Sequence, residues 1–198
     1  AADATRPTIA VAGEIPAGGA RQITVSDTNG RSTYRALNLQ LNKDRGTDRY
    51  GLRLSYTLSK LENDTDDINF RASNANDFDA DRGPSANDRR HVLSAVGFFY
   101  PLAGLTVTAA GLFQSGQPIN FVPDAAIFGT QDLNGDGRSF GENFVGNSDR
   151  YPGLSRNAGR LPWSKTVDLG LRYDWRLAGQ TVQLSADVFN VFDWNNLS

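Results

Sequence analysis

The chain has 198 residues, of which 39% are hydrophobic and 21% are charged, enough for one sizeable folded domain. Its formal net charge of −2 argues against a nucleic-acid partner, and the absence of Cys excludes disulfides and thiolate metal sites. No apolar run of about 18 residues occurs, which excludes a transmembrane helix.

Residues 1–30 carry only short apolar stretches, at 8–12 and 22–25, which predict a loop containing a hairpin. From residue 31 onward, apolar and polar residues alternate with period two, and helical periodicity is nearly absent. This pattern predicts β-strands with one apolar and one polar face.

The first two predicted strands cover 32–44 and 47–60. In the first strand, three leucines alternate with amides. In the second, the side opposite the apolar stripe carries Gly51, Arg53, Ser55, Thr57 and Ser59. The two apolar stripes are Leu37, Leu39 and Leu41, and then Tyr50, Leu52, Leu54, Tyr56 and Leu58.

The next two predicted strands cover 89–101 and 104–117. The first of them is less regular, and we expect its apolar side to be formed by Val92, Val96, Phe98 and Tyr100. The second has an apolar stripe of Leu105, Val107, Ala109, Gly111 and Phe113.

The last two predicted strands cover 163–177 and 180–193. Both alternate clearly, with charged residues such as Asp168, Arg172 and Asp187 on the polar side. The apolar stripes are Val167, Leu169, Leu171, Tyr173 and Trp175, and then Val182, Leu184, Ala186 and Val188.

The predicted strands are long enough to cross a bilayer, which takes about 9–11 residues when the strand is tilted. Their connections alternate between short (43–48, 101–104, 176–180) and long (61–88, 116–162). Bacterial outer-membrane barrels show this asymmetry, with short periplasmic turns and long extracellular loops. The charged polar stripes also require a wide, wet or plugged lumen, because a dry core would bury them at high cost.

Aromatic residues support the same orientation, because they gather near both strand ends as interfacial girdles do. The general preference of aromatic residues for strands is the weaker alternative. Near the short turns lie Tyr50, Phe98, Phe99, Tyr100, Tyr173 and Trp175, and near the long loops lie Tyr34, Phe113, Trp163, Phe189 and Phe192.

Several motifs occur in an order that resembles a known family. They are residues 32–37 (STYRAL), 54–60 (LSYTLSK), 88–91 (DRRH), 132–138 (DLNGDGR), 153–157 (GLSRN) and 188–193 (VFNVFD). Together they resemble the C-terminal barrel of TonB-dependent outer-membrane receptors, particularly the Oar-like group with a carboxypeptidase-regulatory-like N-terminal domain.

The resemblance implies a barrel of about 22 strands, an internal plug domain and energy supplied through the TonB complex. We therefore expect an all-β, antiparallel, up-and-down transmembrane barrel segment of about six strands. Residues 31–198 would form a partial barrel domain without a plug, and residues 1–30 an extracellular loop. Since six strands leave two open edges, we expect the chain to be a fragment of a longer protein.

The resemblance also implies a function, the binding and import of an unknown extracellular ligand across the outer membrane of a Gram-negative bacterium. The expected partners are outer-membrane lipid, the plug domain and the TonB complex, with no nucleic acid. We expect no enzymatic activity. The alternative is a secreted or surface adhesin, a β-rich binding module that would be soluble without detergent.

One loop carries a candidate metal site, Asp132, Asn134 and Asp136 followed by Gly137. Oxygen ligands at alternate positions of a turning chain suit calcium, and Gly permits the sharp bend. The twelfth position holds Asn143 in place of Glu, which favours a polar turn over bound calcium.

Acidic residues crowd the other long loop, and we expect most of them to be solvated. They are Glu62, Asp64, Asp66, Asp67, Asp77, Asp79 and Asp81. Arg89 and Arg90 are expected to pair with acids such as Asp81 or Asp88. His91, the only histidine, lacks the partners of a triad or zinc site, so we expect it at a membrane interface or as a loop anchor.

Overall fold

A computed structural model describes residues 28–66, 77–133 and 149–197. The chain divides into two compact units, and each is described by itself. The sheet unit comprises residues 33–61, 86–119 and 159–197, and the loop unit comprises 28–32, 62–85 and 120–158, in so far as the structure describes them. No helix in these ranges is long and apolar enough to cross a membrane.

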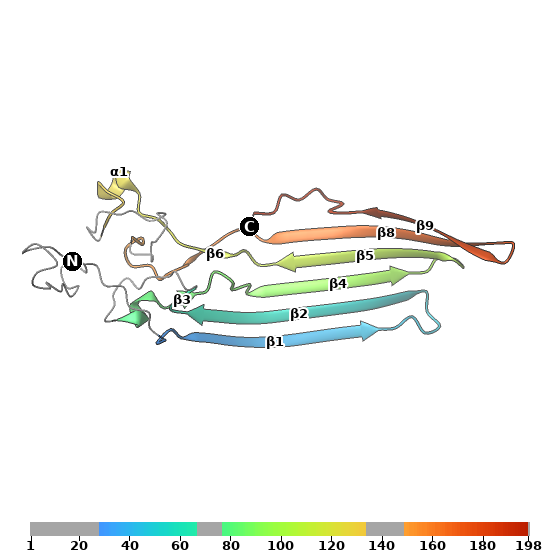
Figure 1. Cartoon of the computed structure of the whole chain (residues 1–198), viewed down its shortest axis with the longest axis horizontal. Coiled ribbons are helices and arrows are strands. Elements are labelled where there is room, and N and C mark those ends of the chain that lie inside the picture. Colours follow the sequence, from blue (N-terminus) through green and yellow to red (C-terminus); the bar gives the residue numbers. More distant parts are fainter. Residues whose placement is uncertain (1–27, 67–76, 134–148, 198) are drawn as a thin grey trace, which may run out of the picture. The chain divides into compact units, whose positions relative to one another are not determined.

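Six long strands form the sheet unit and confirm the predicted all-β antiparallel fold. In Figure 1 they run side by side, each opposite in direction to its neighbours, in the order β1-β2-β4-β5-β8-β9. Their bounds are β1 Ser32–Lys43, β2 Tyr50–Asn63, β4 His91–Phe99, β5 Leu105–Gln114, β8 Ser164–Leu177 and β9 Gln180–Val188. Two short strands, β6 (Pro118–Ile119) and β7 (Gly159–Arg160), pair separately.

The pairing register places the predicted apolar stripes of neighbouring strands on one face. Leu171 of β8 lies opposite both Val107 of β5 and Ala186 of β9. Residues directly opposite in an antiparallel pair share a face. The apolar face thus continues across the sheet, and the polar face carries Arg53, Thr106, Asp168, Arg172 and Gln183.

The apolar face is exposed. Leu37, Leu184 and Trp175 are 54%, 58% and 50% exposed, and no hydrophobic residue in the described part of the chain is buried in a core. A soluble sheet would cover such a face with a second layer. Contact with hydrocarbon is the arrangement that leaves it in a favourable environment.

The prediction for the apolar side of β4 is wrong. Val96 pairs with Arg53 and Phe98 with Gly51, so both lie on the polar face. The apolar face of β4 instead carries Leu93, Ala95 and Phe99, opposite Tyr56, Leu54 and Tyr50. The sequence pattern failed here because β4 has apolar residues on both sides. Only the pairing with neighbouring strands determines which side belongs to the apolar face of the sheet.

Short and long connections occur at opposite ends of the sheet unit, as predicted. Residues 44–49, 100–104 and 178–179 link strands at the end on the right of Figure 1. The tight turns use left-handed backbone at Gly104 (φ 79°) and Gly179 (φ 80°), a conformation that glycine adopts without a Cβ penalty. We call this the turn end and the opposite end the loop end.

The loop unit contains short elements that the sequence did not predict. The 3₁₀ helix η2 (Phe78–Asp81) begins where the Asp77 carboxylate accepts the amide proton of Ala80, and α1 (Ala125–Phe128) begins at Asp124 in the same way. Strand β3 (Gly83–Pro84) pairs with Glu62 and Asn63. Residues 1–27, the predicted hairpin included, lie outside the described residues.

Candidate functional site

The polar face of the sheet unit carries hydrogen-bonded charged and amide side chains on β8 and β9. Asp174 Oδ1 accepts hydrogen bonds from Gln183 Nε2 (2.8 Å) and Arg172 Nε (3.3 Å). Six residues earlier in β8, Asp168 Oδ1 accepts the backbone amide of Asn190 at 2.7 Å. Exposed charges of both signs on this face suit a water-filled or plugged interior and exclude a dry one.

A recess of about 290 Å³ lies at the loop end of the polar face. It combines hydroxyl, amide and carboxylate groups with a few apolar side chains. The lining residues are Tyr34, Thr57, Ser59, Leu61, Asn87, Asp88, Arg89 and Val92. Tyr34 therefore lies on the polar face with Thr57, so its expected place in the outer aromatic girdle is wrong.

Asp88 and Arg160 form an ion pair next to this recess. The Asp88 side chain is 1% exposed, and its Oδ1 accepts the backbone amide of Leu61 at 2.8 Å. Arg160 pairs with the second carboxylate oxygen, and its Nη1 donates to the carbonyl groups of Asp88 (3.1 Å) and Gly116 (3.2 Å). The guanidinium thus binds both the segment that precedes β4 and the segment that follows β5.

The expected partners of Arg89 are wrong. Arg89 Nη1 donates to the carbonyl of Ser115 at 3.2 Å, whereas Asp88 pairs with Arg160 and Asp81 with Arg150. Sequence proximity suggested Arg89, but both Asp88 and Arg89 precede β4, and Arg160 of β7 reaches the Asp88 carboxylate instead. The true partners come from a connection more than 60 residues away.

His91 lies on the apolar face at the loop end. Its ring stacks between Tyr56 (centroids 6.2 Å apart) and Trp163 (5.6 Å), and its Nδ1 shares a hydrogen bond of 2.8 Å with Tyr56 Oη. Pairing of Leu58 with His91 fixes this face. The position agrees with an interfacial residue.

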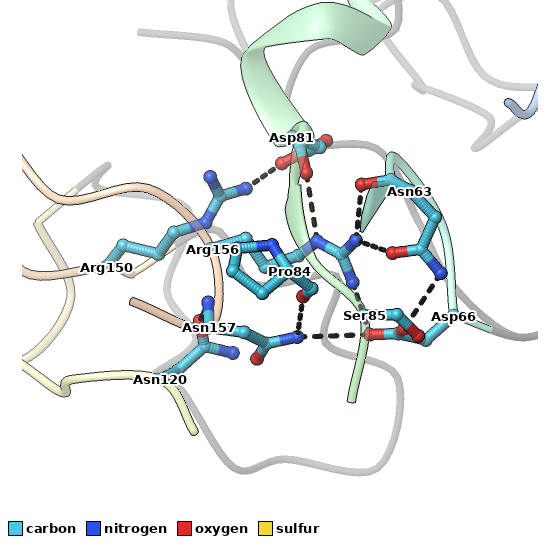
Figure 2. Close-up of polar contacts among 9 residues, drawn as sticks. All are labelled: Asn63, Asp66, Asp81, Pro84, Ser85, Asn120, Arg150, Arg156 and Asn157. Atoms are coloured by element: carbon cyan, nitrogen blue, oxygen red, sulfur yellow. Dashed lines mark hydrogen bonds and ion pairs between the residues drawn. The ribbon is translucent and has the colours of Figure 1, made fainter. Parts of the chain in front are cut away.

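The loop unit is held by a polar cluster centred on Arg156, which is fully buried (Figure 2). Its Nε donates to the carbonyl of Asp81 at 2.9 Å and its Nη2 to the carbonyl of Asn63 at 2.6 Å. Its Nη1 forms an ion pair with Asp66. One guanidinium therefore joins three separate chain segments.

Asn157 extends the cluster. Its backbone adopts a left-handed conformation (φ 54°), which Asn tolerates better than most residues. Its side-chain amide donates to the Pro84 carbonyl at 2.8 Å and to Asp66 at 3.4 Å, while its backbone amide donates to Asn120 at 2.6 Å (Figure 2). The turn at 156–157 is fixed by these bonds.

Close packing and charge complete the cluster. A Cβ on Gly83 would lie 2.3 Å from the Arg156 carbonyl oxygen, so this position requires glycine. Burial lowers the pKa of Arg156, and the charges of Asp66 and Asp64 oppose that shift. Burial and the neighbouring Arg156 charge lower the pKa of Arg150, which pairs with Asp81.

The expectation of a solvated acidic stretch is wrong for Asp64, Asp66 and Asp81. Asp64 and Asp81 are 1% and 0% exposed, and Asp66 binds Arg156. Asp77 caps η2, and Asp67 lies outside the described residues. The sequence signal that was missed is the presence of two arginines, Arg150 and Arg156, in the other long connection, where they pair with Asp81 and Asp66.

The predicted calcium loop is only partly within the described structure. Asp132 donates its backbone amide to Thr130 Oγ1 at 3.0 Å, whereas Asn134 and Asp136 lie outside the described residues. Within the described ranges, no group of three or more His, Asp or Glu residues is arranged to hold a metal ion. Calcium binding stays a prediction.

Comparison with known proteins agrees with the exposed apolar face and the long antiparallel strands. A family model described as an outer membrane beta barrel domain matches residues 2–198. Neither a search of curated proteins nor a search of solved structures found a match. The chain therefore belongs to the outer membrane beta barrel domain family, and its location is the outer membrane of a Gram-negative bacterium.

Proposed function

We propose that this chain forms part of the barrel wall of a TonB-dependent receptor, which binds an extracellular ligand and imports it across the outer membrane. The observation that carries the proposal is the charged polar face, with Arg53, Asp168 and Arg172 opposite a lipid-facing apolar face. Such a face needs a wide lumen filled by water or by a plug domain.

The loop unit supports a role in recognition. Extracellular loops that bind ligands need a defined shape, because ordering a flexible loop on binding costs affinity. The Arg156 cluster holds three chain segments in place before any ligand arrives. We assign ligand recognition to the loop unit and the transport pathway to the polar face.

The proposed partners are outer-membrane lipid around the apolar face, a plug domain against the polar face and the TonB complex as the energy source. We propose no catalytic role for His91, whose ring is stacked between two aromatic residues. A secreted β-rich binding module is less favourable, because it would have to cover the exposed apolar face with another layer.

Photocrosslinking in intact cells tests the proposal. A photoreactive amino acid replaces Arg172 on the polar face, and the matched control replaces the adjacent Leu171 on the apolar face. We expect position 172 to crosslink to a plug segment, with a yield that changes in cells lacking TonB, and position 171 to crosslink only to lipid.

Two results would overturn it. The first is a position 172 that crosslinks to no protein segment and reacts freely with a bulky water-soluble maleimide after Arg172→Cys, which indicates an open pore. The second is a crosslinking pattern that stays the same without TonB. Full extraction of the protein without detergent would favour the secreted module.

A further inference from the structure

We propose that a row of cations at the loop end of the apolar face binds the phosphate groups of a glycolipid in the outer leaflet. This cationic rim consists of Arg35, Lys60 and Lys165, all of which are exposed. The inference rests on the membrane location of the sheet and is independent of the proposed transport function.

Strand alternation places each cation on the apolar face. Lys165 pairs directly with Phe113 of that face. Lys60 follows Leu58 by two residues in β2. Asn38 lies on the polar face, because its Oδ1 accepts a hydrogen bond of 2.8 Å from Thr57 of that face. Arg35 is three residues before Asn38 in β1 and therefore lies on the opposite, apolar face.

The same hydrogen bond shows that two of the cations lie opposite each other on neighbouring strands. Arg35 lies three residues before Asn38, and Lys60 lies three residues after Thr57 on the neighbouring strand. In an antiparallel pair the two cations are therefore cross-strand neighbours at the loop end. Like charges in that position repel each other. An anion bound between them would remove the repulsion.

A row of rings borders the cationic rim and marks the membrane interface. Tyr56, His91 and Trp163 stack across β2, β4 and the start of β8, and Phe113 contacts Trp194 with ring centroids 6.3 Å apart. The Lys165 ammonium lies 5.9 Å from the Trp194 ring centroid. Aromatic rings favour the headgroup level, and long cationic side chains at that level extend toward lipid phosphates.

The two ends of the apolar face differ in how their cations are neutralised. At the turn end, Lys43 pairs with Asp48. At the loop end, neither Arg35 nor Lys165 forms an ion pair with any residue that the structure describes. Glu62, an acidic residue two positions beyond Lys60 in β2, can balance only one of the three cations, so the rim keeps an excess of positive charge.

The location selects the anion. Long loops of outer-membrane barrels lie on the extracellular side, where the lipid is a glycolipid that carries phosphates on its sugar headgroup. A phosphorylated headgroup with acyl chains matches the rim, because its phosphates would pair with the cations and its acyl chains would contact the leucines of the apolar face. A free phosphate would gain only the first of these contacts.

Binding of lipid A to the full protein in detergent tests the inference. We compare the wild type with the triple variant Arg35→Gln/Lys60→Gln/Lys165→Gln, and use Lys43→Gln/Arg45→Gln/Arg49→Gln as a control with the same charge change at the turn end. The probes are bisphosphorylated lipid A, dephosphorylated lipid A, phosphatidylglycerol and inorganic phosphate. Heat-dependent gel mobility checks that each variant keeps its fold.

We expect the rim variant to bind bisphosphorylated lipid A about 100-fold more weakly, on the order of 5-fold per cation removed. The control variant should change by less than about 2-fold, and dephosphorylated lipid A should bind both proteins alike. Equal affinity of wild type and rim variant for bisphosphorylated lipid A would refute the proposal.

Other outcomes would also overturn it. If phosphatidylglycerol binds as tightly as lipid A and depends equally on the rim, the site recognises any phosphate headgroup and not the glycolipid. If inorganic phosphate alone binds as tightly, the apolar face takes no part. If the rim variant alters the oligomeric state but not lipid binding, the rim is a contact between copies of the chain.

Discussion

The sheet unit and the loop unit are stabilised in opposite ways. In the sheet unit, hydrophobic side chains such as Leu184 (58% exposed) point outward, and backbone pairing holds the strands together. In the loop unit, the buried side chains are charged, with Arg156, Asp64 and Asp81 at or below 1% exposure. Hydrocarbon around the sheet takes the place of a core, whereas the loops meet water and must supply their own interior from paired charges.

The sharpest test of this difference is Arg156→Ala. Removing the guanidinium takes the ion-pair partner from Asp66 and a buried donor from the Asn63 and Asp81 carbonyl groups, which we expect to cost about 3–5 kcal/mol in the loop unit. Limited proteolysis should cut within 62–85 and 120–158, while gel mobility of the unheated protein stays that of a folded barrel.

A double variant sharpens the same test. Arg156→Ala combined with Asp66→Ala should lose less stability than the sum of the single variants, because the two groups interact directly. Additive losses of stability would show that the direct interaction of Arg156 with Asp66 does not stabilise the loop unit. Loss of the whole barrel in Arg156→Ala alone would mean that the two units do not fail separately.

The next largest effect is expected on the apolar face. Leu171→Arg puts a charge against hydrocarbon and should destabilise the protein by about 2–4 kcal/mol in urea unfolding from vesicles. The matched control is Arg172→Leu, one residue away on the polar face, which should change stability much less. Equal losses would contradict the assignment of the two faces.

Asp88→Ala tests an ion pair of the sheet unit whose carboxylate is buried. It removes the acceptor of the Leu61 amide and the partner of Arg160, and we expect a loss of about 2 kcal/mol, because Arg160 stays partly accessible to water. Hydrogen exchange of the Leu61 amide is the readout. Unchanged protection of that amide would argue against the assigned bond.

The smallest expected effect is that of Asn157→Ala. The variant loses the hydrogen bonds to Pro84 and Asp66 and keeps an unfavourable left-handed backbone, for a cost of about 1–2 kcal/mol. Asn157→Gly removes the same bonds but tolerates the conformation, so it should be the less destabilising variant. The reverse order would contradict the role of the backbone.

The sequence by itself determined the strands, the apolar faces of all the long strands except β4, and the ends at which short and long connections lie. These features are local. Alternation with period two, as in 167–175, reports the two environments of a strand without knowledge of its neighbours. The turn glycines at 104 and 179 also act within a few residues of their position.

Only the tertiary structure decided which side of β4 faces lipid, which arginines bind Asp81 and Asp88, and that three cations lie along the same edge of the apolar face. In β4 both sides are apolar, so the partners Arg53 and Tyr56 settle the question. Arg156 reaches Asp66 across 90 residues of chain. Buried charges are stable only with a partner, and a partner that distant is brought close by the pairing of strands and not by any spacing in the sequence.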